Sequence, residues 1–272
     1  MKNALSIDLE DWFCVHVMRE AISKADWKNC ELRVVESTRR IMDLLARHGV
    51  EATFFVLGWI AERVPELVRE IELKGHEIAC HGYSHSLITH MTPDELERDL
   101  DKALLAIRNC VKSEIIGYRA PSFSIKEETL WAVDILVDHG FVYDSSVFPV
   151  SFHPDYGIPN APLVPYEIGR GLIEFPLSCV EFFGKRIPCG GGGYFRLYPY
   201  ALTRFLLKRC NAEGRPAIFY LHPWEADPGQ PRVSLPVTSR ARHYMNIGRT
   251  LDRLGQLLTE FEFTSVKKVL SI

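Results

Sequence analysis

VEATFFVLGWIAERVPELVREIELKGHEIAC, residues 50–80, decides the fold class of this chain. The apolar run at 50–57 and the short run at 77–80 each predict a buried strand. Residues 62–74 between them predict a helix, since Pro65 suits the first turn of a helix. A strand, a helix and a second strand in succession predict parallel strands that are covered by helices.

The same alternation continues on both sides of this unit. We expect further strands at 4–8, 115–118, 141–143, 217–221 and 262–266, and helices at 34–48, 93–110, 126–139, 199–211 and 240–260. The helix at 93–110 should begin with a capping box at Thr92 and Glu95. Prolines and four consecutive glycines predict irregular loops and short hairpins over 145–198.

Composition excludes several classes of protein. The 272 residues are 47% hydrophobic and 25% charged, which excludes a disordered chain and a coiled-coil rod. The formal net charge of −3 gives no support to a nucleic acid or an anionic membrane as the main partner. We therefore expect no nucleic-acid partner, and the chain is long enough to bury a large core.

Location is also constrained by the sequence. No stretch approaches 18 apolar residues, so no transmembrane segment is expected. Acids at positions 8, 10 and 11 would interrupt a secretory signal, so we expect a cytoplasmic protein, with a place near the inner membrane face as a variant of that expectation. The seven cysteines show no CxxC spacing and are expected to be reduced thiols without a nucleophilic role.

Three acids follow the first predicted strand. Asp8, Glu10 and Asp11 are compatible with a surface turn and helix cap, or with a general base beside a metal ligand. Along an extended strand Asp8 and Glu10 share one face, and Asp11 joins them only if the chain turns. The sequence alone leaves both interpretations open.

Two further strand ends carry basic side chains. His81 and His85 lie four residues apart after the strand at 77–80, a spacing that allows both to bind one divalent cation. Arg119 follows the strand at 115–118 and is either solvated or paired with a buried carboxylate. Carboxyl ends of parallel strands meet at one edge, so these groups are expected to lie close together.

His222 ends an apolar strand and is followed by proline. It is a candidate general acid or base, with a hydrogen-bonded core histidine as the alternative. Asp144, after the strand at 141–143, is a candidate for orienting His222, or else forms a local turn with Ser145 or Ser146.

Aromatic and loop residues beside these positions are candidates for binding substrate. Trp12, Pro121, Tyr194 and Trp224 adjoin the candidate site residues, and aromatic rings there suit either sugar stacking or packing at the rim. The glycine run 190–193 lacks the pattern of a phosphate loop and is a close-approach or ordinary loop beside a cleft.

The order of these motifs resembles a known family. Asp8 with Glu10 or Asp11, then ATFFVLG, HEIACHGYSH, GYRAPSF, YDSS and YLH, resembles the NodB-type polysaccharide deacetylases of carbohydrate esterase family 4. The segments GGGGYFRLYPY, LHPWEADPGQPR and SRARHYMNIGRT resemble the subgroup linked to exosortase-type exopolysaccharide clusters, which has a C-terminal extension.

This resemblance implies a fold and an activity. The fold is an α/β distorted (β/α)7-type barrel, one domain over 1–272 with a motif core at about 4–225 and an integral extension at about 226–272. The activity is metal-dependent removal of acetyl groups from N-acetylated oligo- or polysaccharides. An O-acetyl esterase or an allantoinase-like cyclic-amide hydrolase on the same fold is the alternative, with a non-catalytic carbohydrate-binding protein as a third possibility, and the oligomeric state is open.

The resemblance also implies residue roles. Asp8 matches the base, Arg119 the arginine that orients it, His222 the catalytic histidine and Asp144 the acid that tunes that histidine. His81 and His85 match metal ligands, with Zn²⁺ expected and Co²⁺, Fe²⁺ or Ni²⁺ as alternatives. The third ligand is Glu10 or Asp11, because the usual adjacent aspartate pair is absent. The tryptophan that often follows the tuning acid is also absent, and Phe148 or Trp224 is expected to fill its volume.

Overall fold

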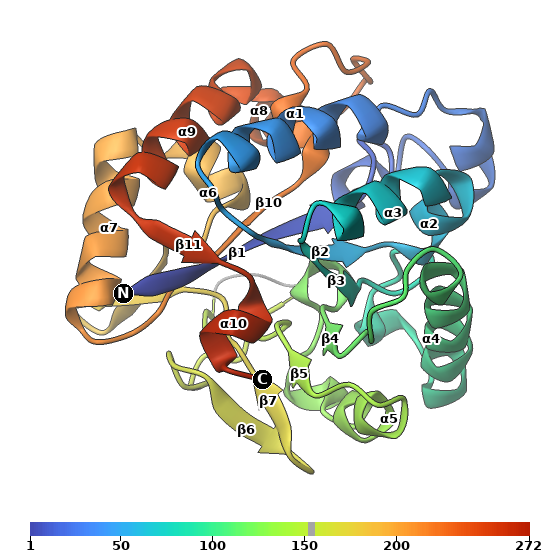
Figure 1. Cartoon of the computed structure of the whole chain (residues 1–272), viewed down its shortest axis with the longest axis horizontal. Coiled ribbons are helices and arrows are strands. Elements are labelled where there is room, and N and C mark those ends of the chain that lie inside the picture. Colours follow the sequence, from blue (N-terminus) through green and yellow to red (C-terminus); the bar gives the residue numbers. More distant parts are fainter. Residues whose placement is uncertain (152–155) are drawn as a thin grey trace.

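The computed structural model describes residues 1–151 and 156–272, and helices surround a strongly curved sheet (Figure 1). The strands are β1 (Lys2–Leu9), β2 (Thr53–Val56), β3 (Glu77–Cys80), β4 (Gly117–Tyr118), β5 (Tyr143–Asp144), β6 (Tyr166–Gly169), β7 (Leu172–Glu174), β8 (Cys179–Phe182), β9 (Lys185–Pro188), β10 (Ile218–Leu221) and β11 (Glu262–Thr264). The α-helices are α1 (Val34–Arg47), α2 (Gly58–Arg63), α3 (Pro65–Leu73), α4 (Pro93–Arg108), α5 (Ala132–Asp138), α6 (Gly192–Leu197), α7 (Tyr200–Ala212), α8 (Val237–Tyr244), α9 (Thr250–Glu260) and α10 (Val266–Leu270). Short 3₁₀ turns that matter below are η1 (His16–Met18), η4 (Pro121–Phe123) and η6 (Pro223–Ala226).

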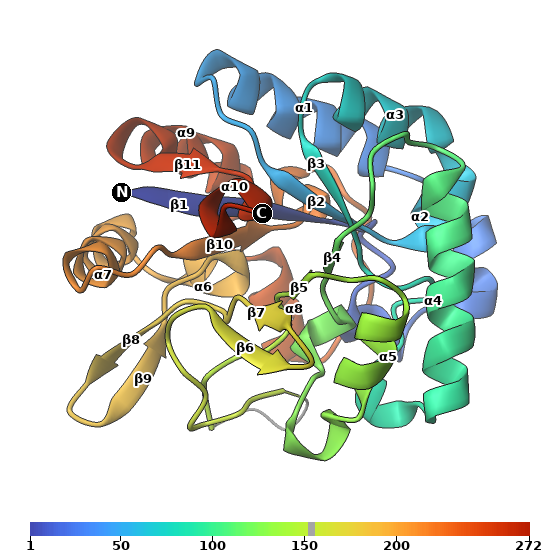
Figure 2. The ribbon, with the colours of Figure 1, turned by 60° about the horizontal axis from the view of Figure 1, so that its bottom comes forward.

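The main sheet is an open barrel of mostly parallel strands. Its order is β10-β1-β2-β3-β4-β5-β7-β6, and β11 pairs with the first residues of β1. Among the described residues of this sheet, β6 and β7 form the one antiparallel pair. The separate hairpin β8–β9 lies on the side of β10 and α7 (Figure 2). Irregular segments bridge the remaining gap, since Leu177 N donates to the Val147 carbonyl and Tyr220 N to the Gly190 carbonyl. The expected distorted α/β barrel is confirmed.

Alternation along β1 decides which side chains reach the interior. Leu5, Ile7 and Leu9 belong to the larger core between sheet and helices, whereas Ala4 belongs to the smaller cluster inside the barrel. Because successive residues of a strand face opposite sides, Asp8 shares the interior face with Ala4. The pleat of β1 therefore delivers a carboxylate to the carboxyl end of the barrel interior.

Helix boundaries follow proline and glycine chemistry. The capping box expected at Thr92 and Glu95 is present at the start of α4. The helix expected at 62–74 is confirmed as α3, which has Pro65 at its start, but its first residues differ, because Glu62 and Arg63 belong to the separate helix α2. A proline disfavours helical backbone at the preceding residue, and Val64 accordingly has φ −133° and ψ 56°.

The C-terminal part of the chain departs further from expectation. The prediction of a single helix at 240–260 is wrong, because the helical conformation is interrupted between α8 and α9. There Met245 is extended and Asn246 is left-handed at φ 56°. The irregular region expected at 145–198 is confirmed in its described part, but it also holds the unforeseen helix α6. Residues 152–155, which belong to that prediction, lie outside the described residues.

The C-terminal residues are built into the barrel. β11 pairs with β1, and the first turn of α10 covers the amino-terminal end of the strands. There Val266 N donates to Thr53 Oγ1 (2.7 Å) and Lys267 N to Glu77 Oε2 (3.1 Å). One end of the barrel is thus closed, and the carboxyl end of the strands is left for a site.

Membrane-spanning helices and cysteines are the two remaining features on which the sequence made a prediction. Within the described residues, no helix is long and apolar enough to cross a membrane. All seven cysteines are free, and six of them are buried.

Candidate active site

A cleft of about 640 Å³ opens at the carboxyl end of the barrel. Its floor holds residues that follow or end β1, β3 and β10, and its walls come from η1, from the turn at η4, from α6 and from α8. The lining includes Asp8, Glu10, His81, His85 and His222. Residues far apart in sequence therefore meet in one cavity whose size suits a small ligand or part of a polymer.

Asp8 forms a buried ion pair with Arg119. Nη1 of Arg119 donates to Asp8 Oδ1 at 2.6 Å, and the two side chains are 0% and 2% exposed. The remaining guanidinium nitrogens are held by Ser145, with Nε on its carbonyl (3.0 Å) and Nη2 on its Oγ (2.9 Å). The face of the guanidinium lies 4.0 Å from the Phe55 ring. Arg119 is thus fixed in place, and its guanidinium is the counter-charge of the buried Asp8 carboxylate.

Glu10, His81 and His85 bring one ligand atom each within 4.8 Å of the others. The Nδ1 of His81 must carry a proton, because it donates to the Arg119 carbonyl at 2.8 Å. Its Nε2 is consequently an unprotonated lone-pair donor when the ring is neutral, and burial first, then His85, lowers the pKa of His81 to about 3. These two imidazoles and one carboxylate are a suitable donor set for Zn²⁺ and also for Fe or Co.

The carboxylate of Glu10 supports the metal interpretation. Its Oε2 lies 2.8 Å from Nε2 of His85, yet within the described residues this buried oxygen has no aligned hydrogen-bond donor. Burial raises the pKa of Glu10, but His85, His222 and His81 together lower it below its ordinary value. A buried carboxylate oxygen and two imidazoles that face one another with no aligned hydrogen bond between them fit a shared cation.

Asp11 points away from this cluster. Its Oδ2 accepts from the backbone N–H groups of Arg33 (2.8 Å) and Val34 (2.9 Å), and its Oδ1 accepts from Trp12 N. Asp11 therefore satisfies the free N–H groups at the start of α1, in the manner of a helix cap. Of the two candidates for a third metal ligand, the geometry favours Glu10.

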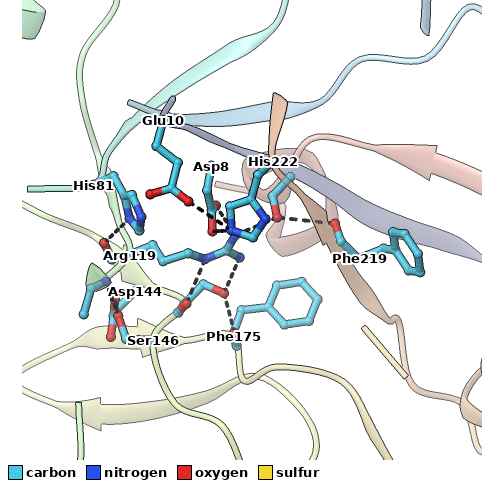
Figure 3. A network of polar contacts seen from close by, with 12 residues as sticks. Asp8, Glu10, His81, Arg119, Asp144, Ser146, Phe175, Phe219 and His222 are labelled. Carbon is cyan, nitrogen blue, oxygen red and sulfur yellow. Dashed lines mark hydrogen bonds and ion pairs between the residues drawn. The ribbon is translucent and has the colours of Figure 1, made fainter. Parts of the chain in front are cut away.

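His222 is held by a carboxylate that the sequence analysis did not select. Glu225 Oε2 accepts from both Nδ1 (2.8 Å) and N (3.0 Å) of His222. The Nε2 of His222 faces Glu10 Oε1 (3.4 Å) and Asp8 Oδ2 (3.7 Å) across the cleft, as Figure 3 shows. Burial lowers the pKa of His222, but Glu225, Glu10 and Asp8 outweigh it and raise the pKa to about 9. The sequence signal that could have identified Glu225 is its place three residues after His222, which is the spacing of a capping box at the start of a helical turn.

The expected contact of Asp144 with His222 is therefore wrong. Asp144 lies on the far side of Arg119 from His222 (Figure 3), where Oδ1 accepts from Ser146 Oγ at 2.5 Å. This is the local turn that the sequence left as the alternative. Ser146 Oγ in turn accepts from Ala120 N (2.7 Å), so Asp144 supports the segment that carries Arg119.

Asp144 also forms a buried carboxyl pair with Glu174, its register partner across β5 and β7. Both side chains are 0% exposed, and burial first raises the pKa of Asp144 to about 6 and that of Glu174 well above its ordinary value. Arg119 and Tyr166 also act electrostatically on this pair. The two carboxyls are best explained as sharing a proton, since two adjacent buried carboxylates cannot both ionise cheaply.

This pair predicts a pH-dependent stability. The pair holds its shared proton to higher pH in the folded chain than the separate carboxyls hold theirs in the unfolded chain, so the free energy of unfolding falls as the pH rises from the ordinary pKa values of these acids, 3.8 and 4.5, through about 6. Glu174→Gln imitates the protonated acid. We expect the variant to gain more than about 1 kcal/mol relative to the wild type between pH 5 and pH 8, one pKa unit being worth that much.

Urea unfolding at the two pH values measures this gain. Glu167→Gln in β6, an exposed glutamate, is the matched control and should follow the wild type at both pH values. Parallel pH profiles for the wild type and Glu174→Gln would show that the pair carries no shared proton.

The four substrate-binding candidates divide equally. Tyr194 and Trp224 line the cleft, and Trp224 stacks on His222 with ring centres 5.3 Å apart. Trp12 does not line the cleft as expected: its ring packs edge-on against Phe13, and its Nε1 donates to the Glu31 carbonyl. Pro121 does not line the cleft either, whereas the two residues after it in η4 do.

The two residues expected to replace the missing tryptophan lie in different places. Trp224 occupies the cleft wall, whereas Phe148 is 1% exposed and stacks on Tyr156 at 5.1 Å.

Comparison with family models divides the chain in two. Residues 28–142 match the model described as polysaccharide deacetylase, and residues 145–271 match a domain of unknown function, DUF3473. The candidate site straddles this division, because His81, His85 and Arg119 lie in the first match and His222 lies in the second, while Asp8 and Glu10 precede both. The cleft is thus formed jointly by both matched segments.

Curated relatives match parts of the chain. A chitooligosaccharide deacetylase of Sinorhizobium fredii is 35% identical over 100 residues, which are 36% of this chain and 44% of that protein. A peptidoglycan-N-acetylglucosamine deacetylase of Bacillus cereus is 37% identical over 89 residues, which are 33% and 30% of the two chains. This chain therefore spans less than half of the length of these relatives.

Solved structures match the fold over the whole chain. A putative polysaccharide deacetylase from Mycobacterium smegmatis is 18% identical, with all of this chain and 90% of that chain covered and a TM-score of 0.64. A family 4 carbohydrate esterase pseudoenzyme from Bacillus anthracis is 16% identical, with 99% and 65% covered and a TM-score of 0.52. Since one of these is a pseudoenzyme, the shared fold alone does not establish activity, and the site residues must carry that argument.

Proposed function

Because the family model and the curated relatives support a polysaccharide deacetylase of the NodB type, we propose that this chain hydrolyses N-acetyl groups of amino sugars in an exopolysaccharide or its biosynthetic intermediate. The observation that carries the proposal is the meeting of three units in one cleft. These are the Asp8–Arg119 pair, the Glu10–His81–His85 cluster and the His222–Glu225 pair. The exopolysaccharide is proposed from the motif resemblance of residues 190–200, 221–232 and 239–250.

The roles of the residues follow from their contacts. Glu10, His81 and His85 would hold a divalent ion, which supplies polarisation of the acetyl carbonyl and acidity of a water. Asp8, with one oxygen on Arg119, is the base that accepts the proton of the attacking water through its other oxygen. His222, with its Nδ1 proton held by Glu225, presents Nε2 to the departing nitrogen as the acid. Acetate and a free amine are the products.

Acetate release tests this function directly. Purified full-length protein with Zn²⁺ or Co²⁺ is incubated with N-acetylated chitooligosaccharides, O-acetylated xylooligosaccharides and a cyclic amide such as allantoin. We expect acetate and free amine from the first substrate, loss of activity after verified removal of metal, and recovery on adding it back.

The other substrates decide between the alternatives. Acetate from the O-acetylated substrate alone would replace this proposal by an esterase, and ring opening of the cyclic amide alone would replace it by the allantoinase-like activity. Binding of the oligosaccharide without any turnover in metal-replete protein would identify a non-catalytic binding protein.

A further inference from the structure

The two oxygens of Glu225 have separate partners. Oε2 accepts from His222, as described above, and Oε1 accepts from Nε of Arg196 at 2.6 Å. The Glu225 and Arg196 side chains are 0% and 2% exposed. Burial raises the pKa of Glu225, but Arg196 and then His222 outweigh it and lower the pKa to about 2. Glu225 therefore stands between the candidate acid and a buried cation.

Arg196 is itself held by the turn at 243–246, which separates α8 from α9. Its Nη1 donates to the carbonyls of His243 (2.7 Å) and Met245 (3.0 Å), and Asn246 Nδ2 donates back to the Arg196 carbonyl (2.7 Å). Trp224, whose ring lies 5.1 Å from the guanidinium, also stacks on His243 with ring centres 4.3 Å apart. The turn at 243–246 is thus attached to Arg196 from two directions.

The glycine run explains how Arg196 reaches this place. Gly191 has φ +111° and pairs with Tyr220, two residues before His222, and a Cβ on it would lie 2.1 Å from the Tyr220 carbonyl oxygen. A Cβ on Gly192 would meet the Tyr220 ring at 2.5 Å. Only glycine allows so close an approach of α6 to β10. The loop left without a role by the sequence therefore seats α6, and with it Arg196, against the strand that carries the acid.

We propose that Arg196 is a positioning residue for acid catalysis, acting through Glu225 on His222 and coupling the 243–246 turn to the leaving-group side of the cleft. This inference rests on the proposed deacetylase function. Arg196 fixes the Glu225 carboxylate so that Oε2 faces Nδ1, which keeps the Nδ1 proton in place and leaves Nε2 to protonate the departing nitrogen. The residues that do this lie in the three segments 190–200, 221–232 and 239–250, which these contacts hold together.

The leaving group separates positioning from mere stability. An amine needs a proton to depart, whereas 4-nitrophenolate departs without one. We therefore expect Arg196→Met to lower kcat on N-acetylated chitooligosaccharide by about 100-fold or more, the lower end of general-acid effects, with KM little changed. On 4-nitrophenyl acetate the same variant should stay within about fivefold of the wild type. Arg196→Lys keeps the charge but loses the forked set of contacts, so its kcat on the N-acetylated substrate should lie between those of the wild type and Arg196→Met.

Arg215→Met is the matched control. Arg215 is also a buried arginine that binds a glutamate and backbone carbonyls, Glu213 and Cys179 among them, but it precedes the amino end of β10. We expect it to lower the denaturant midpoint and leave the ratio of the two activities unchanged.

The outcomes are distinct. Equal losses on both substrates in a folded Arg196→Met, or the same change of ratio in Arg215→Met, would overturn the positioning role. If Arg196→Met does not fold, the ratio in Arg196→Lys decides in the same way. A wild type that releases no acetate from any N-acetylated substrate would overturn the proposed function, and the inference with it, before any variant is compared.

Discussion

Replacing Asp8 by asparagine is expected to lower kcat for acetate release by about 10²- to 10⁴-fold, the range of general acid–base effects. The physical reason is that asparagine keeps the shape of the side chain and one oxygen for Arg119, but it cannot accept a proton from water. Asp8 Oδ1 is occupied by Arg119 at 2.6 Å, so proton transfer depends on Oδ2, on the side of His222. Steady-state kinetics on N-acetylated chitooligosaccharide measures the loss, and elemental analysis should find the same bound metal as in the wild type.

Asp11→Asn is the matched control within the same acidic stretch. Asp11 is as deeply buried as Asp8, but its contacts are backbone N–H groups at the start of α1. Weakening this cap should cost about 1 kcal/mol of stability and leave kcat within a few-fold of the wild type. If Asp11→Asn lost activity and Asp8→Asn kept it, the base would have to be reassigned to the other acid.

Much of the fold was predictable because its signals are local. Apolar runs, prolines, glycines and the capping box at Thr92 mark element boundaries through short-range chemistry, and they place the motifs at strand ends. The two expected helices that differ from the structure do so for local reasons too: the one at 62–74 begins only after Val64, which precedes a proline, and the one at 240–260 is interrupted at the left-handed Asn246. The periodicity of hydrophobic residues continues across such breaks, and it does not reveal them.

The candidate site was predictable in part for the same reason. Asp8 and Glu10 both line the cleft as the strand argument expected, but Glu10 lies beyond β1, where a tight turn with a hydrogen bond from Glu10 N to the Asp8 carbonyl places it. Whether Glu10 or Asp11 faces the histidines depends on where α1 begins in space, because the N–H groups of α1 are what attract Asp11. A contact between residues 23 positions apart leaves no local signal.

The partner of His222 shows the same limit more strongly. Asp144 was a reasonable expectation from motif order, yet Glu225 lies only three residues after His222 and reaches it within the η6 turn. Arg196 approaches from α6, and its importance depends on contacts with residues about 50 positions later. The local signal was passed over, whereas the distant contacts of Arg196 required the tertiary structure.

Replacing a proposed metal ligand is expected to have the second large effect. Glu10→Gln and His81→Ala each remove one donor from the Glu10–His81–His85 cluster. Loss of groups that merely support a ligand weakens metal binding by about 10- to 100-fold, so loss of a ligand should weaken it by more than about 100-fold. Equilibrium dialysis with Zn²⁺ measures the dissociation constant without depending on turnover, and acetate release should fall in parallel at limiting Zn²⁺.

Two controls make this experiment decisive about the ligand set. Asp11→Asn removes a carboxylate one residue from Glu10, and His243→Gln removes a buried histidine that also lines the cleft. Both should bind Zn²⁺ as the wild type does, since Asp11 caps α1 and His243 binds Gln230 through Nε2 at 2.8 Å. Zinc binding that survives Glu10→Gln but is lost in Asp11→Asn would contradict the assignment. A buried carboxylate oxygen without an aligned donor is costly unless a cation compensates it. If Glu10→Gln and Asp11→Asn both retained tight zinc binding, Glu10 would not be a ligand and its Oε2 would need another explanation.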